Sequence, residues 1–357
     1  MASKQRDLIL YFYTKPTTFV RRDINFLQND YIVREFSFYH PSKWYTPVLF
    51  LKQLVFIIEH STRAKLSLCM FAGYHSFFPA LLNKIQKKPF VIILGGTECV
   101  SIKSIGYGVV TKGLIGKFAK WSYHFTRHFT PVHQSLIYSY NTYDDSIEKI
   151  QGIKHYFPNL EANFTAIPNG FDPEKFKQQA HLKKTENSFI TVAFDLHKNH
   201  LYQLKGVDLI ISVAPHFPFC TFTIIGLSAL ENKPRNVQLL PALPQDKLIE
   251  ELSKNEFYFQ LSMSEGFPNT LCEAMLCNCI PVVSDVASMP EIIGDSGFLL
   301  NKRNSHLLKK LIETSVLRCD KETLAKRSRS RIINNYHIDQ RKEKFLMLIE
   351  SLTKLSQ

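Results

Sequence analysis

The chain alternates between short, continuous apolar runs and longer stretches in which apolar residues recur at helical spacing. Continuous apolar runs are typical of strands buried on both faces, as in parallel sheets that helices cover. In the first half they predict strands at residues 8–13, 31–38, 66–71 and 89–94. We expect helices between them. The helix at 45–60 carries four apolar residues at helical spacing: Val48, Leu51, Val55 and Ile58.

The same alternation returns after residues 167–173, a run of turn-forming Pro, Asn, Gly and Asp that is typical of a linker. Before this linker, we expect one more helix at 143–157. Beyond it, apolar runs predict strands at residues 189–194, 219–225, 237–240, 257–261, 280–284 and 297–300. From residue 305 to the C-terminus the pattern is helical and strongly charged.

These patterns predict an α/β fold of two doubly wound, Rossmann-like domains that face a central cleft. A chain of 357 residues is also too long for one ordinary core. We place the boundary in the linker, which gives an N-terminal domain of residues 1–168 and a C-terminal domain of residues 169–357. The final helices could pack back on the N-terminal domain.

The most informative motif lies at residues 264–275, directly after the apolar run 257–261. Gly266 and Pro268 break regular structure, and Asn269 is a good N-cap for the helix that follows. The free backbone N–H groups at such a helix start favour an anion such as phosphate. The motif therefore predicts a strand, a tight loop and a helix at the edge of the sheet where ligands bind.

Two carboxylates flank this expected anion site. Glu265 lies in the loop, and Glu273 lies one turn into the helix. Both could accept hydrogen bonds from the hydroxyl groups of a sugar or a ribose. The helix dipole alone would account for Glu273, because acidic residues are common in the first turn of a helix. It does not account for Glu265, which has no evident structural purpose in a Gly/Pro loop.

Composition and net charge limit the classes of protein to which the chain could belong. With 45% hydrophobic and 21% charged residues the chain is typical of a globular protein, and its net charge is +13. Such a charge favours an anionic partner, which could be nucleic acid, a phospholipid surface or a phosphorylated substrate. No segment reaches the roughly 18 apolar residues of a membrane span, and the run at 8–13 is too short for a secretory signal. We therefore expect a cytoplasmic location.

The seven cysteines are odd in number and lie mostly in apolar runs, which favours buried, reduced thiols. Cys272, Cys277 and Cys279 are close together, but their spacing is not that of a paired CxxC motif and no histidine lies near them. We therefore expect no metal site.

Residues 105–133 interleave lysines with aromatic side chains. One interpretation is a basic aromatic helix that rests on an anionic membrane surface. A second is an amphipathic helix packed on the sheet with a solvated basic face. A third is nucleic-acid binding, but no recognised binding motif accompanies the charge, so we expect no nucleic-acid partner.

The motif at 264–275, Ser-Glu-Gly-Phe-Pro-Asn-Thr-Leu-Cys-Glu-Ala-Met, closely resembles the signature of family 4 retaining glycosyltransferases, which have the GT-B fold. Further segments resemble that family in the same order: the start of its C-terminal domain at 167–176, its phosphate-binding lysine and following helix at 205–210, and its closing strands at 281–283, 289–293 and 297–300. The N-terminal half matches this family only in layout.

The resemblance implies that a nucleotide-diphosphate sugar, with UDP favoured over GDP, lies across the C-terminal domain. Glu265 would contact the sugar and Glu273 the ribose. Lys205 and the helix N-terminus would neutralise the departing diphosphate, so that neither a metal nor another cofactor is needed. The remaining donor-binding residues would lie in the same loop and helix start: Gly266, Phe267, Pro268, Asn269, Thr270 and Leu271.

The chain departs from the family at positions that bear on phosphate and acceptor binding. The arginine shortly before Lys205 is absent, so another cation, for instance Lys198, would have to replace it. Gly95 stands where many relatives have a histidine, and the first loop lacks paired glycines, although Lys15 or Arg21 could reach a phosphate. The candidates for the acceptor or phosphate side are therefore Lys15, Gly95, Gly96 and Lys198.

Two functions stay open. The first is a metal-independent, retaining hexosyltransferase that moves a sugar from a nucleotide-diphosphate sugar to a glycan or lipid-linked acceptor. The resemblance places it in bacterial surface-polysaccharide synthesis, as a peripheral protein on the inner face of the cytoplasmic membrane. The second is a donor-binding or scaffolding subunit of a glycan-assembly complex, suggested by the missing arginine and histidine. A glycosidase is disfavoured, because both carboxylates would have to flank one bond.

Overall fold

The computed structural model describes residues 6–110, 112–193, 196 and 199–354. The chain forms two six-stranded sheets with the strand orders β2-β1-β3-β4-β5-β8 and β11-β10-β9-β12-β13-β14. Every strand pair in these two sheets is parallel. In each sheet the chain winds outward from a central strand in both directions. The structure therefore confirms the predicted α/β fold of two doubly wound sheets.

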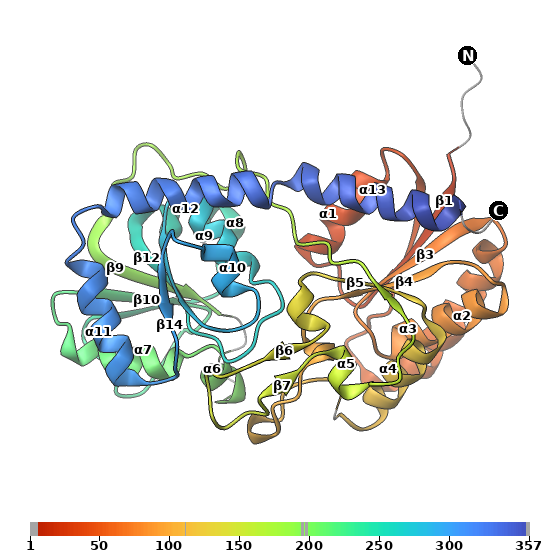
Figure 1. Cartoon of the computed structure of the whole chain (residues 1–357), viewed down its shortest axis with the longest axis horizontal. Coiled ribbons are helices and arrows are strands. Elements are labelled where there is room, and N and C mark those ends of the chain that lie inside the picture. The colour runs from red at the N-terminus through yellow and green to blue at the C-terminus, as the bar shows by residue number, and fades with distance from the viewer. Residues whose placement is uncertain (1–5, 111, 194–195, 197–198, 355–357) are drawn as a thin grey trace, which may run out of the picture.

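The first sheet and its helices occupy the N-terminal half (Figure 1). Their bounds are β1 (Leu8–Tyr13), α1 (Thr18–Leu27), β2 (Ile32–Ser37), α2 (Thr46–Ser61), β3 (Ala64–Met70), α3 (Tyr74–Ile85), β4 (Phe90–Leu94), α4 (Gly113–Phe125), β5 (His128–Pro131), β6 (Ser139–Tyr140), β7 (Ile150–Gln151), α5 (Ile153–Tyr156) and β8 (Asn163–Phe164). The helices α2, α3 and α4 pack side by side, whereas α1 packs against the last helix of the chain.

The second sheet and its helices follow the linker. Their bounds are β9 (Thr185–Val192), α6 (Asn199–Leu204), α7 (Val207–Val213), β10 (Thr221–Ile225), β11 (Val237–Leu240), α8 (Gln245–Lys254), β12 (Asn255–Gln260), α9 (Asn269–Leu276), β13 (Ile280–Ser284), α10 (Met289–Ile293), β14 (Phe298–Leu300), α11 (Ser305–Val316), α12 (Lys321–Asn335) and α13 (Ile338–Lys354). None of the described helices is both long enough and apolar enough to cross a membrane.

The prediction of a helix at 143–157 is wrong. This segment contains only the two-residue strand β7 and the single turn α5. The Asp144 carboxylate accepts a hydrogen bond from the backbone N–H of Ser146 at 2.8 Å, a local turn that competes with helix formation. Gly152 then has φ of 112°, outside the helical region. Local side-chain and glycine geometry therefore overrides the apolar periodicity.

Stacked phenylalanines form the centre of the second sheet. The ring of Phe189 in β9 lies 4.7 Å from the rings of both Phe257 and Phe259 in β12, and 5.3 Å from that of Phe222 in β10. All four side chains are buried. The cysteines have the expected character, since all seven are free and only Cys319 is exposed.

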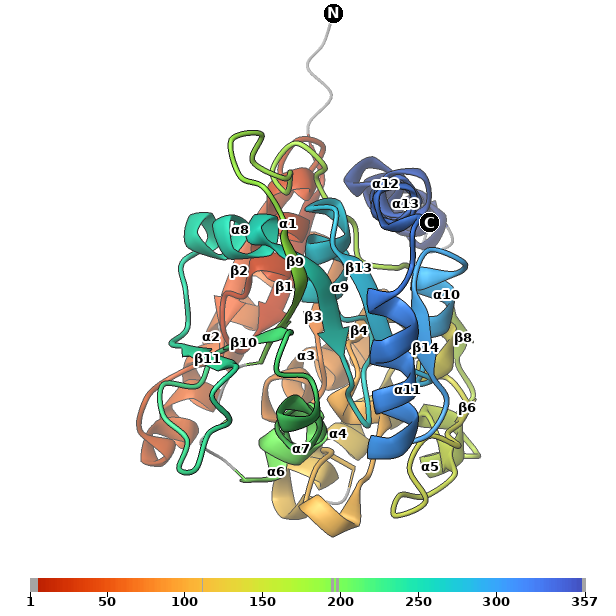
Figure 2. The same ribbon diagram turned by 90° about the vertical axis from the view of Figure 1, so that its left-hand side faces the viewer.

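The last helix returns to the N-terminal half. The helices α12 and α13 follow one another along the side of both halves, and they overlap when viewed along the long axis (Figures 1 and 2). In α13, Arg341 donates hydrogen bonds to both carboxylate oxygens of Asp23 in α1, at 2.8 and 2.7 Å. It also donates to the carbonyls of Ile167 and Pro168 in the linker, at 2.9 and 3.0 Å. Arg341 thus joins α13, α1 and the linker, while the domain boundary itself stays a prediction.

Removing Arg341 would leave the Asp23 carboxylate buried without its cation. We expect Arg341→Ala to lower the free energy of unfolding by about 3–5 kcal/mol, measured by urea denaturation. Lys342→Ala is the matched control, because Lys342 lies 3.9 Å from Asp30 at the surface. Equal urea midpoints for the two variants would contradict a structural role for the buried pair.

Candidate functional site

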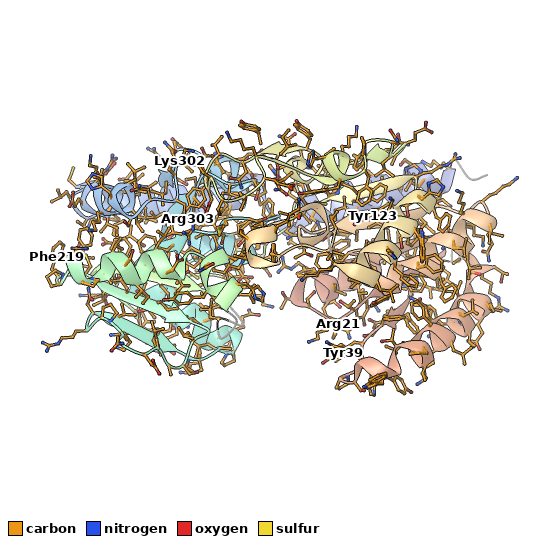
Figure 3. All side chains as sticks on the ribbon, turned by 90° about the horizontal axis from the view of Figure 1, so that it is seen from below. Arg21, Tyr39, Tyr123, Phe219, Lys302 and Arg303 are labelled. Carbon is orange, nitrogen blue, oxygen red and sulfur yellow. The ribbon has the colours of Figure 1, made fainter. Side chains whose placement is uncertain are left out.

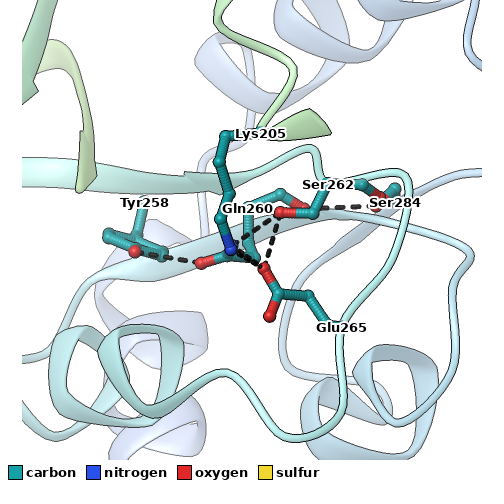
Figure 4. A network of polar contacts seen from close by, with 6 residues as sticks. All are labelled: Lys205, Tyr258, Gln260, Ser262, Glu265 and Ser284. Atoms are coloured by element: carbon teal, nitrogen blue, oxygen red, sulfur yellow. Dashed lines mark hydrogen bonds and ion pairs between the residues drawn. The ribbon is translucent and has the colours of Figure 1, made fainter. Parts of the chain in front are cut away.

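The Glu265 carboxylate lies at the carboxyl end of β12, where three donors converge on one of its oxygens (Figure 4). Its Oε1 accepts hydrogen bonds from Lys205 Nζ at 2.5 Å, Gln260 Nε2 at 2.9 Å and Ser262 Oγ at 2.8 Å. The other oxygen, Oε2, forms no hydrogen bond within the part of the chain that the structure describes. Among the described residues, Glu265 is thus held at one oxygen and has no hydrogen-bond donor at the other.

Neighbouring strands fix the donors of this network. The Tyr258 hydroxyl donates to Gln260 Oε1 at 3.1 Å, and Gln260 Nε2 also donates to Ser262 Oγ at 2.9 Å. From the end of β13, the Ser284 hydroxyl donates to the Ser262 carbonyl at 2.6 Å. These contacts leave Gln260 and Ser262 little freedom, so the orientation of Glu265 is preorganised.

Sequence reasoning missed Tyr258, Gln260 and Ser262, although the sequence contains a signal for them. Along β12 and the residues that follow, aromatic and aliphatic side chains alternate with these three polar ones. Alternate residues of a strand point to the same side of the sheet. A polar set at alternate positions of a buried strand therefore indicates a polar network near its carboxyl end.

Gly206 brings Lys205 to Glu265. It has φ of 70°, a left-handed conformation that favours glycine, and it precedes the first turn of α7. A Cβ atom at this position would lie 2.3 Å from the Leu261 carbonyl oxygen, so only glycine allows the backbones to approach this closely. The Lys-Gly pair therefore places the ammonium group beside the loop that follows β12.

The helix α9 begins beside Glu265, but Asn269 is not its N-cap as we expected. The helix starts at Asn269 itself, after Pro268 in an extended conformation. The Asn269 side-chain oxygen instead accepts a hydrogen bond from Asn169 Nδ2 in the linker at 2.9 Å, so it is not available to cap the helix. The backbone N–H groups at the helix start, including that of Thr270, follow directly after the loop that contains Glu265.

Two of the expected donor-binding residues have side chains in the protein core. The Phe267 ring is buried and packs against the rings of Phe171 and Tyr336, with centroids 6.2 and 5.2 Å away. The Leu271 side chain is fully buried in α9. Only the backbone groups of these two residues could contact a ligand.

Glu273 is buried, with 8% of its surface exposed, and Arg22 from α1 supplies nearby positive charge. Burial raises the pKa of Glu273 to about 7, although Arg22 and Lys175 act in the opposite direction. The Arg22 guanidinium donates to the Gly170 carbonyl and lies 5.3 Å from the centre of the Phe171 ring. Sequence reasoning missed Arg22, because only tertiary structure brings α1 to α9.

The two halves meet at glycines beside Glu265. A Cβ atom on Gly266 would lie 1.9 Å from the Gly95 carbonyl oxygen, and one on Gly96 would lie 3.2 Å from the Gly266 nitrogen. The structure therefore brings the expected Gly95 and Gly96 together with the Glu265 loop. A side chain at position 95 would collide with the ring of Phe71, which lies 2.1 Å from the Cβ position. Phe71 thus fills the space that a larger residue would need.

The other expected cations lie elsewhere. The Lys15 ammonium lies 4.6 Å from the centre of the Tyr39 ring. Arg21 donates to both carboxylate oxygens of Glu35, at 2.9 and 2.7 Å, so this guanidinium is already paired. Lys198, the expected replacement for the missing arginine, lies outside the described residues.

Further contacts between the halves surround the site. Arg303, labelled in Figure 3, lies 2.5 Å from Asp208 in its own half and 3.4 Å from Asp144 in the other. His133 Nε2 lies 3.0 Å from the Glu291 carboxylate across the cleft. A small apolar cluster also crosses between the halves and includes Val100, Ile102, Ile147, Leu204 and Met263.

Little space is left between the halves at Glu265. A cavity of about 30 Å³ there is lined by residues of both halves, including Gly96, Tyr140 and Glu265. Typical small-molecule sites have volumes of roughly 300–1,000 Å³. The structure therefore has a closed cleft at this point.

One comparison with known proteins concerns the C-terminal half. Residues 173–335 match the family model described as glycosyl transferases group 1. The matched segment covers a little less than half of the chain. It contains Lys205, Glu265 and Glu273, so the expected donor-side residues all lie within the matched glycosyltransferase segment.

Solved structures show that the whole chain has the GT-B fold expected from the sequence. Alr3699/HepE from Anabaena, solved with UDP and glucose, superimposes with a TM-score of 0.69 over 96% of this chain and 99% of that one, at 15% identity. Sucrose-phosphate synthase from Thermosynechococcus elongatus gives a TM-score of 0.72 over 98% and 100% of the two chains, at 12% identity. At these identities the similarity shows the fold alone.

Curated relatives match the chain over shorter stretches. The gpi3 subunit of phosphatidylinositol N-acetylglucosaminyltransferase from Schizosaccharomyces pombe is 27% identical over 143 residues, which cover 36% of this chain and 30% of that protein. One subunit of the Arabidopsis thaliana enzyme with the same name is 24% identical over 164 residues, or 42% and 36% of the two chains. The chain thus spans about a third of the length of these relatives.

The raised pKa of Glu273 predicts a fall in stability with pH. The folded state keeps this proton up to about pH 7, whereas the unfolded chain releases it near the ordinary value of 4.5. The folded state therefore loses stability as the pH rises between these two values. We expect Glu273→Gln to remove part of this fall in urea midpoints, whereas Glu313→Gln, at an exposed position in α11, should keep it. An unchanged slope in Glu273→Gln would contradict the assignment.

Proposed function

We propose that the chain is a retaining, metal-independent glycosyltransferase that moves a sugar from a nucleotide-diphosphate sugar to a glycan or lipid-linked acceptor. The observation that carries this proposal is the one-sided hydrogen bonding of Glu265 beside Lys205. Three donors hold Oε1, while Oε2 has no hydrogen bond from the described residues and could accept hydrogen bonds from sugar hydroxyls. An acceptor of this kind, oriented before the ligand arrives, is what recognition of a hydroxylated ring requires.

Lys205 would act on the leaving group of the same donor. Its ammonium touches the carboxylate that would hold the sugar, so the phosphate bonded to the anomeric carbon comes within its reach. When the bond between that carbon and the phosphate oxygen breaks, the electron pair stays with the diphosphate. Lys205 and the N–H groups at the start of α9 would stabilise the charge that develops there.

The acceptor hydroxyl would form the new bond to the anomeric carbon from the face that the diphosphate leaves, and its proton would pass to the departing phosphate. Glu273, in the second turn of α9, would bind the ribose. The donor could reach these groups only after the halves separate, because the cavity beside Glu265 is about 30 Å³.

The comparisons support the donor and acceptor classes in general terms. The HepE structure with UDP and glucose supports a UDP-sugar as the donor. The curated relatives are named as subunits of a phosphatidylinositol N-acetylglucosaminyltransferase, which supports a lipid-linked acceptor. We extend the proposal to a peripheral position on the inner face of the cytoplasmic membrane. A place in bacterial surface-polysaccharide synthesis stays a prediction from the sequence resemblance.

A second candidate function is a donor-binding or scaffolding subunit without turnover. The direct Lys205–Glu265 ion pair favours it, because both groups are already engaged with each other. The name "subunit" in the curated relatives is consistent with it. Tight binding of a nucleotide sugar without hydrolysis or transfer would identify this function.

Replacement of Glu265 tests the transferase. We expect purified protein to hydrolyse a UDP-sugar slowly, and Glu265→Gln to reduce the rate at least about 100-fold, since one preorganised group often contributes that much. Glu256→Gln is the matched control, because Glu256 forms an ion pair with Lys321 at 3.1 Å and the two pairs are similarly buried. Undiminished turnover in Glu265→Gln, with its melting temperature unchanged, would disprove the role of Glu265.

The source of positive charge gives a separate test. Because Lys205 and the start of α9 would neutralise the diphosphate, we expect activity to persist in excess EDTA. Lys205→Met should lower kcat far more than it raises KM, since the charge develops in the transition state. Loss of activity in EDTA that Mg²⁺ or Mn²⁺ restores would contradict the metal-independent mechanism.

A further inference from the structure

The helix α2 exposes the apolar stripe that would ordinarily face a core. The stripe consists of Val48, Leu51, Val55 and Ile58, and all four side chains are exposed, Leu51 and Ile58 by 64% and 63%. The buried positions of α2 are instead Leu49, Gln53, Ile57 and Ser61. The helix therefore has apolar residues on both sides, and one of these sides faces solvent.

A specific hydrogen bond holds α2 in this orientation. Gln53 is fully buried, and its side-chain amide donates to the His75 carbonyl in α3 at 2.8 Å. Phe50 packs against Phe118 of α4, with ring centroids 5.4 Å apart, so the helix is also anchored to its other neighbour. The exposed stripe is therefore a fixed feature of the packed helical layer.

Two tryptophans continue the same surface. Trp44, directly before α2, is 94% exposed, and Trp121 of α4 is 46% exposed. The Trp121 ring packs on Phe118, with centroids 5.2 Å apart, and Phe118 in turn packs on Phe50 of α2. Ring contacts thus connect Trp121 to α2. We call the stripe of α2 together with Trp44 and Trp121 the α2 face. The helix α2 lies at the outer edge of the N-terminal half (Figures 1 and 3).

The charge around the α2 face is mainly positive. The helices α2, α3 and α4 contain the lysines Lys52, Lys84, Lys117 and Lys120, but only one acidic residue, Glu59. Lys52, Lys117 and Lys120 are exposed. Lysine is depleted in protein–protein interfaces, whereas lysines and tryptophans beside an apolar stripe are typical of helices that lie on an anionic bilayer.

We infer that the α2 face binds the surface of an anionic phospholipid bilayer, with the stripe among the acyl chains and the lysines at the headgroups. This goes beyond the proposed transfer reaction, because it requires neither donor nor acceptor. It also assigns the anchor mainly to α2, whereas the sequence pointed to residues 105–133. Trp44 lies in the connection from β2 to α2, and therefore at the edge of the sheet formed by the carboxyl ends of the strands. The cleft lies at the same edge. A lipid-linked acceptor could enter the cleft from there.

The chain contains its own probe for this surface. Trp44 and Trp121 are its only tryptophans, and both belong to the α2 face. We expect their fluorescence to shift to shorter wavelength when the protein is mixed with vesicles of phosphatidylcholine and phosphatidylglycerol, and the protein to sediment with these vesicles. Vesicles of pure phosphatidylcholine should bind much less, by about fivefold for each lysine that contacts the surface.

Matched substitutions distinguish vesicle binding by the α2 face from nonspecific binding by other exposed apolar residues. The double variant Leu51→Gln/Ile58→Gln should lower the partition coefficient at least about tenfold, since two apolar side chains no longer enter the acyl region. Leu317→Gln in the C-terminal half is the control, because Leu317 is 83% exposed but lies outside the α2 face. The double variant should keep the slow hydrolysis of a UDP-sugar and the melting temperature of the original chain.

Three results would overturn the inference. The first is no fluorescence shift with anionic vesicles. The second is binding that Leu51→Gln/Ile58→Gln leaves unchanged. The third is a dimer in analytical ultracentrifugation that this variant dissociates, without any vesicle binding, since the α2 face would then be an interface with a second copy. Failure of UDP-sugar hydrolysis would leave all three readouts intact, so the proposed function and this inference can fail separately.

Discussion

The Lys205–Glu265 ion pair is the constraint on which the candidate site depends. A partly buried ion pair is stable only when hydrogen bonds compensate the lost hydration of both charges. Among the described residues this compensation goes to one carboxylate oxygen, through Gln260 and Ser262. The other oxygen of Glu265 has no hydrogen bond from the described residues. A ligand with hydroxyl groups could donate hydrogen bonds to that oxygen, which would link stability of the pair to recognition of a sugar.

Part of this site could be predicted from sequence because its determinants are local. An apolar run followed by Gly266 and Pro268 can form little other than a strand, a loop and a helix start, and the structure has these elements. The approach of Lys205 could be suggested only by the family resemblance, since it depends on the left-handed Gly206 packing against the Leu261 carbonyl. The position of Arg22 near Glu273 could not be predicted from the sequence for the same reason. Contacts between distant segments leave no pattern in one sequence.

The helix α2 shows a different limit. Periodicity identifies the apolar stripe of a helix, but it does not say whether a core or something outside the protein covers that stripe. The usual expectation buries the stripe, whereas here the fully buried positions of α2 are Gln53 and Ile57. The Gln53 amide N–H donates to the His75 carbonyl of another helix, while its Oε1 is buried without a partner among the described residues. The orientation of α2 is therefore a tertiary property, and the exposed stripe is informative because it is not the default.

The contacts between the halves differ in strength, and this difference indicates where the cleft can open. On the linker side, Arg341 ties α13 to α1 and to two linker carbonyls in a fully buried arrangement, which is costly to break. On the cleft side the contacts include Arg303 with Asp144, His133 with Glu291, a hydrogen bond from Asn141 to the Met263 carbonyl, and a small apolar cluster. Partly exposed ion pairs contribute little stability, and local openings occur where contacts are few. Separation at Gly96 and Gly266 is therefore the less costly movement, with the linker and α13 as the connection that persists.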